Sequence, residues 1–178
     1  MKIMALDPAT VLGFAYGESG DIPKSGSVRL KGRNDDVNVA PFNALAFLRD
    51  QFVLGKPDLC CIEHYMNPVA QKSADAIILQ IMVFGVIVAV CRSYGVRIET
   101  PHRATVLKHF IGKANMGERA LTKQAVIKRS IALRYVPHGC VDDNRADACA
   151  LFDYAAATFA RAAPRELVFF GESPHDPP

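Results

Sequence analysis

The sequence predicts an α/β fold with a mixed central sheet, a hairpin edge and flanking helices. Short apolar segments with the length of strands come first, and they then alternate with segments whose apolar residues recur at helical spacing. Prolines and glycines separate many of these segments, as they do at turns. The chain has 178 residues, of which 50% are hydrophobic, so it is long enough to bury a core without disulfides or structural metals.

The amino-terminal part contains three expected strands and a helix. Residues 2–6 form an apolar strand that stops at Pro8, because proline cannot donate to a strand ladder. Residues 11–16 follow after a tight turn, and residues 27–30 alternate weakly, so these three strands can form an antiparallel edge. Apolar residues at helical spacing predict a helix over residues 38–53.

The remaining chain begins with residues 59–62, a continuous apolar strand typical of the middle of a sheet. The later elements are a long apolar helix at about 70–93, a short strand at 96–99, basic helices at about 101–110 and 122–134, and a final helix at about 143–162. No repeat or second domain is apparent. We therefore expect one domain over residues 1–162 and a Pro-rich tail over residues 163–178.

The apolar stretch 76–91 could be mistaken for a membrane span. It is shorter than the roughly 20 residues that a bilayer requires, and it contains Gln80. A helix that is apolar on all sides is instead buried in a core or against another subunit. Because the protein is small, we expect the outer face of this helix to form a homodimer interface and expect no membrane association.

The five cysteines predict a reducing, cytoplasmic setting. Their number is odd and their spacing does not match a zinc site. The first residues lack the features of a signal peptide. Cys60 and Cys61 lie in an apolar strand, so we expect both to be packing residues that point to opposite faces.

Positive charge is concentrated in one part of the chain. Residues 102–134 contain eight basic residues and one acidic residue, whereas the formal net charge of the whole chain is only +3. Such asymmetry favours a face that binds phosphate groups. A solvated helical surface is the alternative explanation.

Three acidic residues stand at places where α/β folds form sites. Asp7 follows the first strand, Glu63 follows the strand at 59–62, and Asp147 lies one turn into the final helix. Sites in open α/β sheets form outside the carboxyl ends of strands. Neighbouring carboxylates repel one another, at a cost of about 4 kcal/mol for a pair at roughly 4 Å. Oxygen ligands favour Mg²⁺ or Mn²⁺, and two such ions would suit phosphodiester hydrolysis.

Each acidic residue also has a simpler explanation. Asp7 precedes a proline, as aspartate often does in turns, and Glu63 could reach solvent at a strand end. Asp142 and Asp143 could be helix caps. Asp147 is harder to explain in this way, because most of its neighbours are small or apolar.

Three segments resemble the RuvC family of Holliday-junction resolvases. They are MALDPATVLGFAYG, CCIEHYM and DDNRADACALFDYA, and their order and spacing extend the resemblance from about residue 2 to residue 160, most similar to the phage or prophage branch. The resemblance implies a ribonuclease H-like fold, a homodimer, Mg²⁺ or Mn²⁺ as cofactor, and symmetric cutting of four-way DNA junctions. It also implies products that a ligase can seal.

The resemblance assigns the metal ligands by position. The first-strand aspartate of the family matches Asp7, the strand glutamate matches Glu63, and the aspartate of the last helix matches Asp147. A fourth ligand, usually Asp or His, stands three residues before that last aspartate, where this chain has Asn144. Asp143 shares a helix face with Asp147 and could replace it, so the fourth ligand stays open between Asp143 and Asn144.

The basic segment of the family matches residues 105–128 of this chain. Phosphate contacts from such residues position DNA without specifying its sequence. The DNA-binding candidates are Lys108 and Lys123, which fall on matching positions, and Lys113 and Arg119 in the same segment.

Tyr65 is a further candidate, for stacking on bases at the junction. Its distance from Glu63 differs by one residue from the position of the family's aromatic residue, and Met66 occupies the matching place.

Three other functions compete with a junction resolvase. The DPAT segment with Gly13 is similar to the phosphate-binding hairpin of actin-like and sugar-kinase ATPases, but those proteins need two such domains and this chain has the length of one. Asn144 in place of an acid favours a branched-DNA-binding protein without catalysis. A less selective nuclease acting on flaps or forks would have the same acidic residues.

Overall fold

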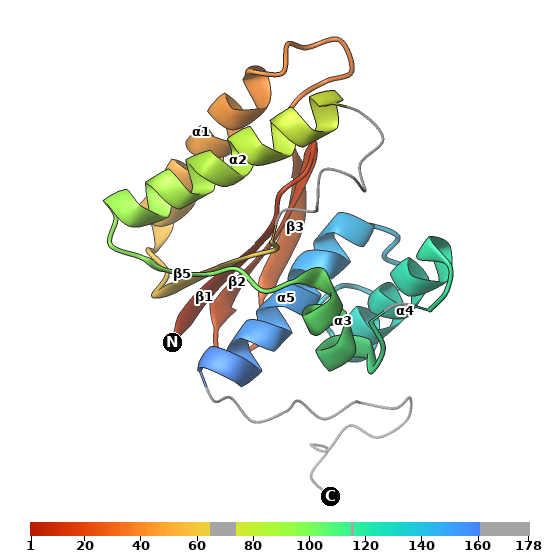
Figure 1. Ribbon diagram of the computed structural model, residues 1–178. Helices are drawn as coiled ribbons and strands as arrows, with labels where there is room; N and C mark the ends of the chain where they lie inside the picture. The colour runs from red at the N-terminus through yellow and green to blue at the C-terminus, as the bar shows by residue number, and fades with distance from the viewer. Residues whose placement is uncertain (65–73, 115, 161–178) are drawn as a thin grey trace, which may run out of the picture.

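A computed structural model describes residues 1–64, 74–114 and 116–160, which form a five-stranded sheet with helices on both faces (Figure 1). The strand order is β3-β2-β1-β4-β5, where β1, β2 and β3 are antiparallel and β1, β4 and β5 are parallel. The predicted mixed sheet with a hairpin edge is therefore confirmed. The elements are β1 (Lys2–Asp7), β2 (Val11–Glu18), β3 (Lys24–Arg29), α1 (Val39–Leu54), β4 (Leu59–Ile62), α2 (Ala74–Ser93), β5 (Arg97–Glu99), α3 (Arg103–Ile111), α4 (Arg119–Ala132) and α5 (Asp143–Phe159).

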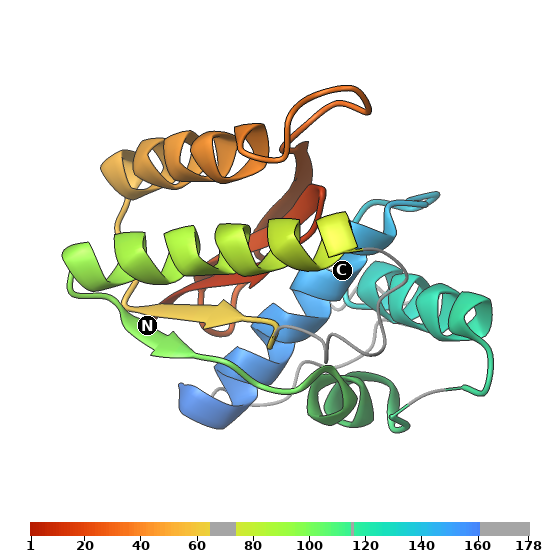
Figure 2. The same ribbon diagram turned by 45° about the horizontal axis from the view of Figure 1, so that its top comes forward.

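The sheet separates two hydrophobic cores. Helices α1 and α2 cover one face, and α3, α4 and α5 lie on the other (Figures 1 and 2). Successive residues of β1 enter different cores: Met4 and Leu6 pack with α1 and α2, whereas Ile3 and Ala5 pack with α5. This alternation follows from the two-residue period of a strand. It also fixes which side of the sheet the residue after Leu6 faces.

Cys60 and Cys61 of β4 also alternate between the two cores. Cys60 belongs to the core of α1 and α2, and Cys61 belongs to the core of α5, as their adjacent positions predict. All five cysteines are free thiols, and four of them are buried.

Element boundaries differ most from the expectation at β3, α4 and α5, and α5 ends at Phe159, three residues before its expected end. Strand β3 begins at Lys24, three residues before its expected start. Helix α4 begins at Arg119, because Thr122 lies within its first turn and donates a hydrogen bond to the carbonyl of Glu118. The helix ends at Ala132, two residues early, since Arg134 has a φ of 60° that a right-handed helix cannot contain.

Helix α2 is the one described helix long and apolar enough to cross a membrane, a test that core helices of soluble proteins also pass. One side of it, including Leu79, Val83 and Ile87, is buried in the core shared with α1. The side chain of Gln80 donates a hydrogen bond to the carbonyl of Pro8 at 3.5 Å, which ties α2 to the β1–β2 turn. We therefore treat α2 as a packed helix. The predicted tail at 163–178 lies outside the described residues.

Candidate active site

The parallel pairing of β1 and β4 brings Asp7 and Glu63 together. Leu6 pairs with Ile62, and the ladder continues when the backbone N–H of Glu63 donates to the carbonyl of Leu6 at 3.0 Å. The next residue along each strand is an acid. By strand alternation both side chains face the same side of the sheet as Ala5 and Cys61, which is the side covered by α5.

Helix α5 supplies the third acid from directly above this strand end. Its first turn is capped by Asp142, whose carboxylate accepts a hydrogen bond from the backbone N–H of Arg145 at 3.1 Å, so the cap interpretation of Asp142 is confirmed. The helix lies very close to β2 at Gly13. A Cβ atom there would lie only 2.0 Å from the carbonyl oxygen of Asn144. Glycine at position 13 therefore sets how closely Asp147 approaches the sheet.

The three acids line one cleft of about 800 Å³. Its walls come from the ends of β1 and β4, the turn after β1, the start of α2, the amino-terminal turns of α3, α4 and α5, and the loop before α4. The charged or amide side chains among its lining residues are Asp7, Glu63, Gln80, Arg103, Glu118, Arg119, Lys123, Asp143, Asn144 and Asp147. The cleft thus combines a carboxylate centre with basic groups from two helices.

Burial makes the carboxylates costly to charge. Glu63 is 8% exposed and Asp147 is 7% exposed, and both are among the few buried charged residues of the described chain. Burial raises the pKa of each, although the charge of Arg103 acts in the opposite direction. The pKa of Asp7 lies well above its ordinary value because of burial, with the charges of Glu63 and Asp147 adding to the effect. The centre therefore favours the entry of positive charge.

Arg103 already supplies one positive charge. Its Nη1 atom lies 3.0 Å from Oε2 of Glu63, and its Nη2 atom lies 3.0 Å from Oδ2 of Asp147. Burial alone would lower the pKa of Arg103, but the charges of Asp147, Glu63 and Asp7 together raise it. In the sequence, Arg103 is one of eight basic residues between positions 102 and 134, and no role was predicted for it. Its place just after β5, the third parallel strand to end at this edge, is the signal that could have identified it.

The donor set matches a hard divalent cation in its chemistry but not in its present arrangement. Three carboxylates offer oxygen ligands of the kind that Mg²⁺ and Mn²⁺ prefer. Among the described residues, however, no three His, Cys, Asp or Glu side chains are grouped as a metal site. The guanidinium of Arg103 bridges two of the three acids. A metal ion therefore fits the residues only if Arg103 moves.

The two candidates for a fourth ligand both line the cleft. The carboxylate of Asp143 is ion-paired with the ammonium group of Lys123, so Asp143 is not the helix cap that one interpretation suggested. The backbone of Asn144 packs on Gly13.

The structure brings two of the four predicted basic residues to the centre. Arg119 and Lys123 line the cleft, and their charges lower the pKa of Asp147 against the effect of burial. Lys108 and Lys113 are exposed and do not line it. Tyr65 lies outside the described residues.

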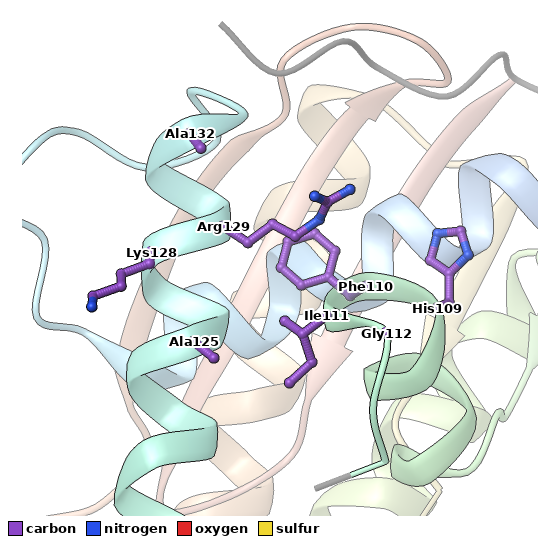
Figure 3. Close-up of a pocket in the computed structure, with 8 residues that line it drawn as sticks. All are labelled: His109, Phe110, Ile111, Gly112, Ala125, Lys128, Arg129 and Ala132. Atoms are coloured by element: carbon purple, nitrogen blue, oxygen red, sulfur yellow. The ribbon is translucent and has the colours of Figure 1, made fainter. Parts of the chain in front are cut away.

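A second cavity, of about 650 Å³, lies between α3 and α4 and shares no lining residue with the acidic cleft. The guanidinium of Arg129 lies 5.6 Å from the centre of the Phe110 ring, a cation–π contact (Figure 3). Lys128 points away from that ring (Figure 3). None of the residues that line this cavity is acidic, so the carboxylate centre does not extend into it.

Comparisons with known proteins identify the fold. No protein-family model and no curated protein matches this chain. Its structure is similar to Thermus thermophilus RuvC in complex with a Holliday junction substrate, with a TM-score of 0.67 and 13% sequence identity over 93% of this chain and 100% of that one. A second T. thermophilus RuvC structure gives a TM-score of 0.67 at 15% identity, with the same coverage of both chains.

The yeast mitochondrial Holliday junction resolvase Ydc2 is also similar, with a TM-score of 0.58 and 10% identity over 84% of this chain and 75% of that one. The predicted resemblance to RuvC is thereby confirmed for the fold, whereas the phage or prophage branch stays a prediction. The chain has the α/β, ribonuclease H-like fold found in RuvC.

Proposed function

We propose that this protein is a metal-dependent endonuclease that hydrolyses phosphodiester bonds in branched DNA and resolves four-way junctions by paired nicks. The observation that carries the proposal is the convergence of Asp7, Glu63 and Asp147 in one cleft, which Arg119 and Lys123 also line. The fold is shared with a RuvC that was solved with a Holliday junction substrate. A phosphate backbone needs both parts of the cleft, because acids hold the catalytic cations and basic groups hold the DNA.

Asp7, Glu63 and Asp147 would hold Mg²⁺ or Mn²⁺, two ions in each centre. When bound, the ions would supply Lewis-acid activation and charge neutralisation at the phosphate. The protein's own part is to keep the three carboxylates together in a largely buried place where they repel one another. Asp143 or Asn144 would complete the ligand set, and both stand at the edge of the cleft.

The basic residues would position the DNA. Arg119 and Lys123 lie where a phosphate would approach the acids, and the exposed Lys108 and Lys113 would contact the backbone farther away. The ion pair of Lys123 with Asp143 would open for Lys123 to reach a phosphate.

Paired nicks need two centres, and α2 offers a surface for a homodimer. Ile78 is 46% exposed and Ile81 is 52% exposed, and with the exposed Gly85 they form an apolar stripe along the outer side of the helix. An exposed apolar stripe of this kind marks an interaction surface. A second copy of the chain is the partner that would bring a second acidic centre to the same junction.

A branched-DNA-binding protein without catalysis is the second candidate. Asn144 replaces the fourth acid, and Arg103 lies between Glu63 and Asp147, so the centre as it stands has features of an inactive site. A less selective nuclease for flaps or forks differs only in the shape of its substrate.

One experiment separates these functions. The protein is incubated with a synthetic four-way junction, a fork, a flap and a linear duplex, each with Mg²⁺ or Mn²⁺, and both binding and cleavage are measured. We expect symmetric nicks in the junction that a ligase can seal. Binding without cleavage in either metal would support a branched-DNA-binding protein without catalysis. Equal cutting of all branched substrates would support the less selective nuclease.

The Asp7→Asn variant tests the assignment of the centre. It keeps the shape of the side chain, so it should bind the junction as tightly as the wild type and cut it at least about a hundredfold more slowly. Asp50→Asn is the matched control, because Asp50 is exposed on α1, on the other face of the sheet. An Asp7→Asn variant that cuts at the wild-type rate would show that the centre lies elsewhere.

A further inference from the structure

The position of Arg103 between two acids has a consequence for metal entry. Arg103 is the first residue of α3, and its two terminal nitrogens contact different carboxylates, one on Glu63 and one on Asp147. Nη2 contacts both oxygens of Asp147, at 3.0 and 3.2 Å. The oxygens engaged in this way are those that a metal ion would need.

The Arg103 bridge balances the charges of two buried acids. Glu63 and Asp147 are each more than nine-tenths buried, and a buried carboxylate without a partner is strongly destabilising. Lys123, the other cation paired in this region, is engaged with Asp143. Arg103 therefore provides the ion pairs of both buried acids within the described part of the chain.

We propose that Arg103 is the counter-cation of the metal-free centre and competes with the metal ions for Glu63 and Asp147. This inference rests on the proposed metal-dependent function. A guanidinium and a divalent cation on the same carboxylate oxygens repel each other, so metal entry requires Arg103 to turn away. Its side chain is 29% exposed and lines the cleft, which gives it a solvent side to turn toward.

Arginine suits this role better than lysine. Its planar guanidinium presents several N–H groups in fixed directions, so one side chain can hold two carboxylates at once. An ammonium group in the same place keeps the charge but does not span both acids in this way. The Arg103→Lys variant should therefore lie between the wild type and Arg103→Gln in Mn²⁺ affinity and in melting temperature.

Mn²⁺ binding by titration calorimetry and melting temperatures in EDTA and in Mn²⁺ test the proposal. Arg103→Gln should bind Mn²⁺ about tenfold more tightly or more, because the competing cation is gone. It should also melt below the wild type in EDTA and gain more from Mn²⁺. Arg103→Lys should give values of both quantities between those of Arg103→Gln and the wild type. Arg49→Gln, on the exposed side of α1, is the matched control and should change neither quantity.

The outcomes separate this inference from the proposed function. If the wild type cuts junctions and Arg103→Gln binds Mn²⁺ no more tightly than the wild type, the competition is refuted and the function stands. If Arg103→Gln does not fold, Arg103→Lys carries the same test, and unchanged Mn²⁺ affinity there refutes it. If the wild type and every folded variant neither bind Mn²⁺ nor cut any substrate, the metal-dependent function fails, and this inference fails with it.

Discussion

Replacing Gly13 with alanine should move the whole carboxylate centre. The new Cβ would lie 2.0 Å from the carbonyl oxygen of Asn144 and 2.6 Å from its carbonyl carbon. Ordinary contact begins at 3.4 Å, so the start of α5 has to retreat from β2 by about 1.4 Å. The obstructing atoms are backbone atoms, which cannot rotate out of the way as a side chain does. Asp147 lies on the same helix and would move with it.

The expected cost has two parts. Overpacking a close contact of this kind destabilises a protein by about 1–3 kcal/mol. In a chain of this length each kcal/mol lowers the melting temperature by roughly 2–4 °C. A displacement near 1 Å in a catalytic group slows a reaction by on the order of a hundredfold. Urea unfolding and junction cleavage in Mg²⁺ measure the two effects separately.

Gly17→Ala is the matched control for this substitution. Gly17 lies in the same strand and faces the same side as Gly13, but its nearest obstacle is the Cα atom of Pro23 at 3.3 Å. A contact of that length needs an adjustment of only a few tenths of an ångström, far from the acids. If Gly13→Ala matches the wild type and Gly17→Ala in both stability and cleavage, the close approach of α5 does not position the centre.

Three further predictions follow from the cleft and from α2. Burial and the charges of Glu63 and Asp147 raise the pKa of Asp7, so in EDTA the folded protein holds a proton that the unfolded chain loses above its ordinary pKa of 3.8. The free energy of unfolding in EDTA should therefore fall as pH rises through the raised pKa. Urea titrations should show that Asp7→Asn removes this part of the loss. The proposed homodimer should be lost in the Ile81→Arg variant, which should sediment as a monomer in analytical ultracentrifugation beside a dimeric wild type. A monomeric wild type, or a variant that stays dimeric, would contradict an interface on α2. Lys123→Gln should lower the slope of log affinity against log salt by about one for junction binding, whereas an unchanged slope would remove Lys123 from the phosphate contacts.

The two-residue period of the strands and the parallel pairing of β1 and β4 explain why the positions of Asp7 and Glu63 could be predicted. A strand of continuous apolar residues must end somewhere, and at this sheet edge Asp7 and Glu63 are the residues that follow β1 and β4. Alternation then fixes the side of the sheet that they face, because Ala5 and Cys61 pack in the core of α5. These properties depend on neighbouring residues, which a sequence displays directly.

The parts that could not be predicted depend on side-chain directions and helix ends. The sequence places Arg103 just after the strand at 96–99, but it does not show which acids the side chain contacts, since its partners lie 40 and 44 positions away. Lys108 and Lys113 belong to the same basic segment as Arg119 but do not line the cleft, because the rotation of α3 and the loop after it decides where their side chains point. Charge per segment therefore identifies the basic segment but not which of its residues line the cleft.

Asn144 and Arg103 together reduce the negative charge of the centre. The resemblance to RuvC implies a metal ligand, usually Asp or His, where this chain has Asn144, and Arg103 adds a positive charge between Glu63 and Asp147. Both features ease the burial of the remaining carboxylates in the metal-free protein, and both weaken the attraction for a divalent cation. Asn144→Asp should therefore tighten Mn²⁺ binding, as Arg103→Gln should, and each should lower the melting temperature in EDTA.

The two changes act on the same cations and on neighbouring ligands, so their effects should not simply add. In the double variant the added aspartate has no guanidinium beside it when metal is absent. We expect its melting temperature in EDTA to fall by more than the sum of the two single losses, whereas Mn²⁺ should restore it nearly to that of the metal-loaded wild type. Strictly additive losses in EDTA would mean that Arg103 and position 144 do not share one electrostatic centre. Asp143, and not Asn144, would then be the fourth metal ligand.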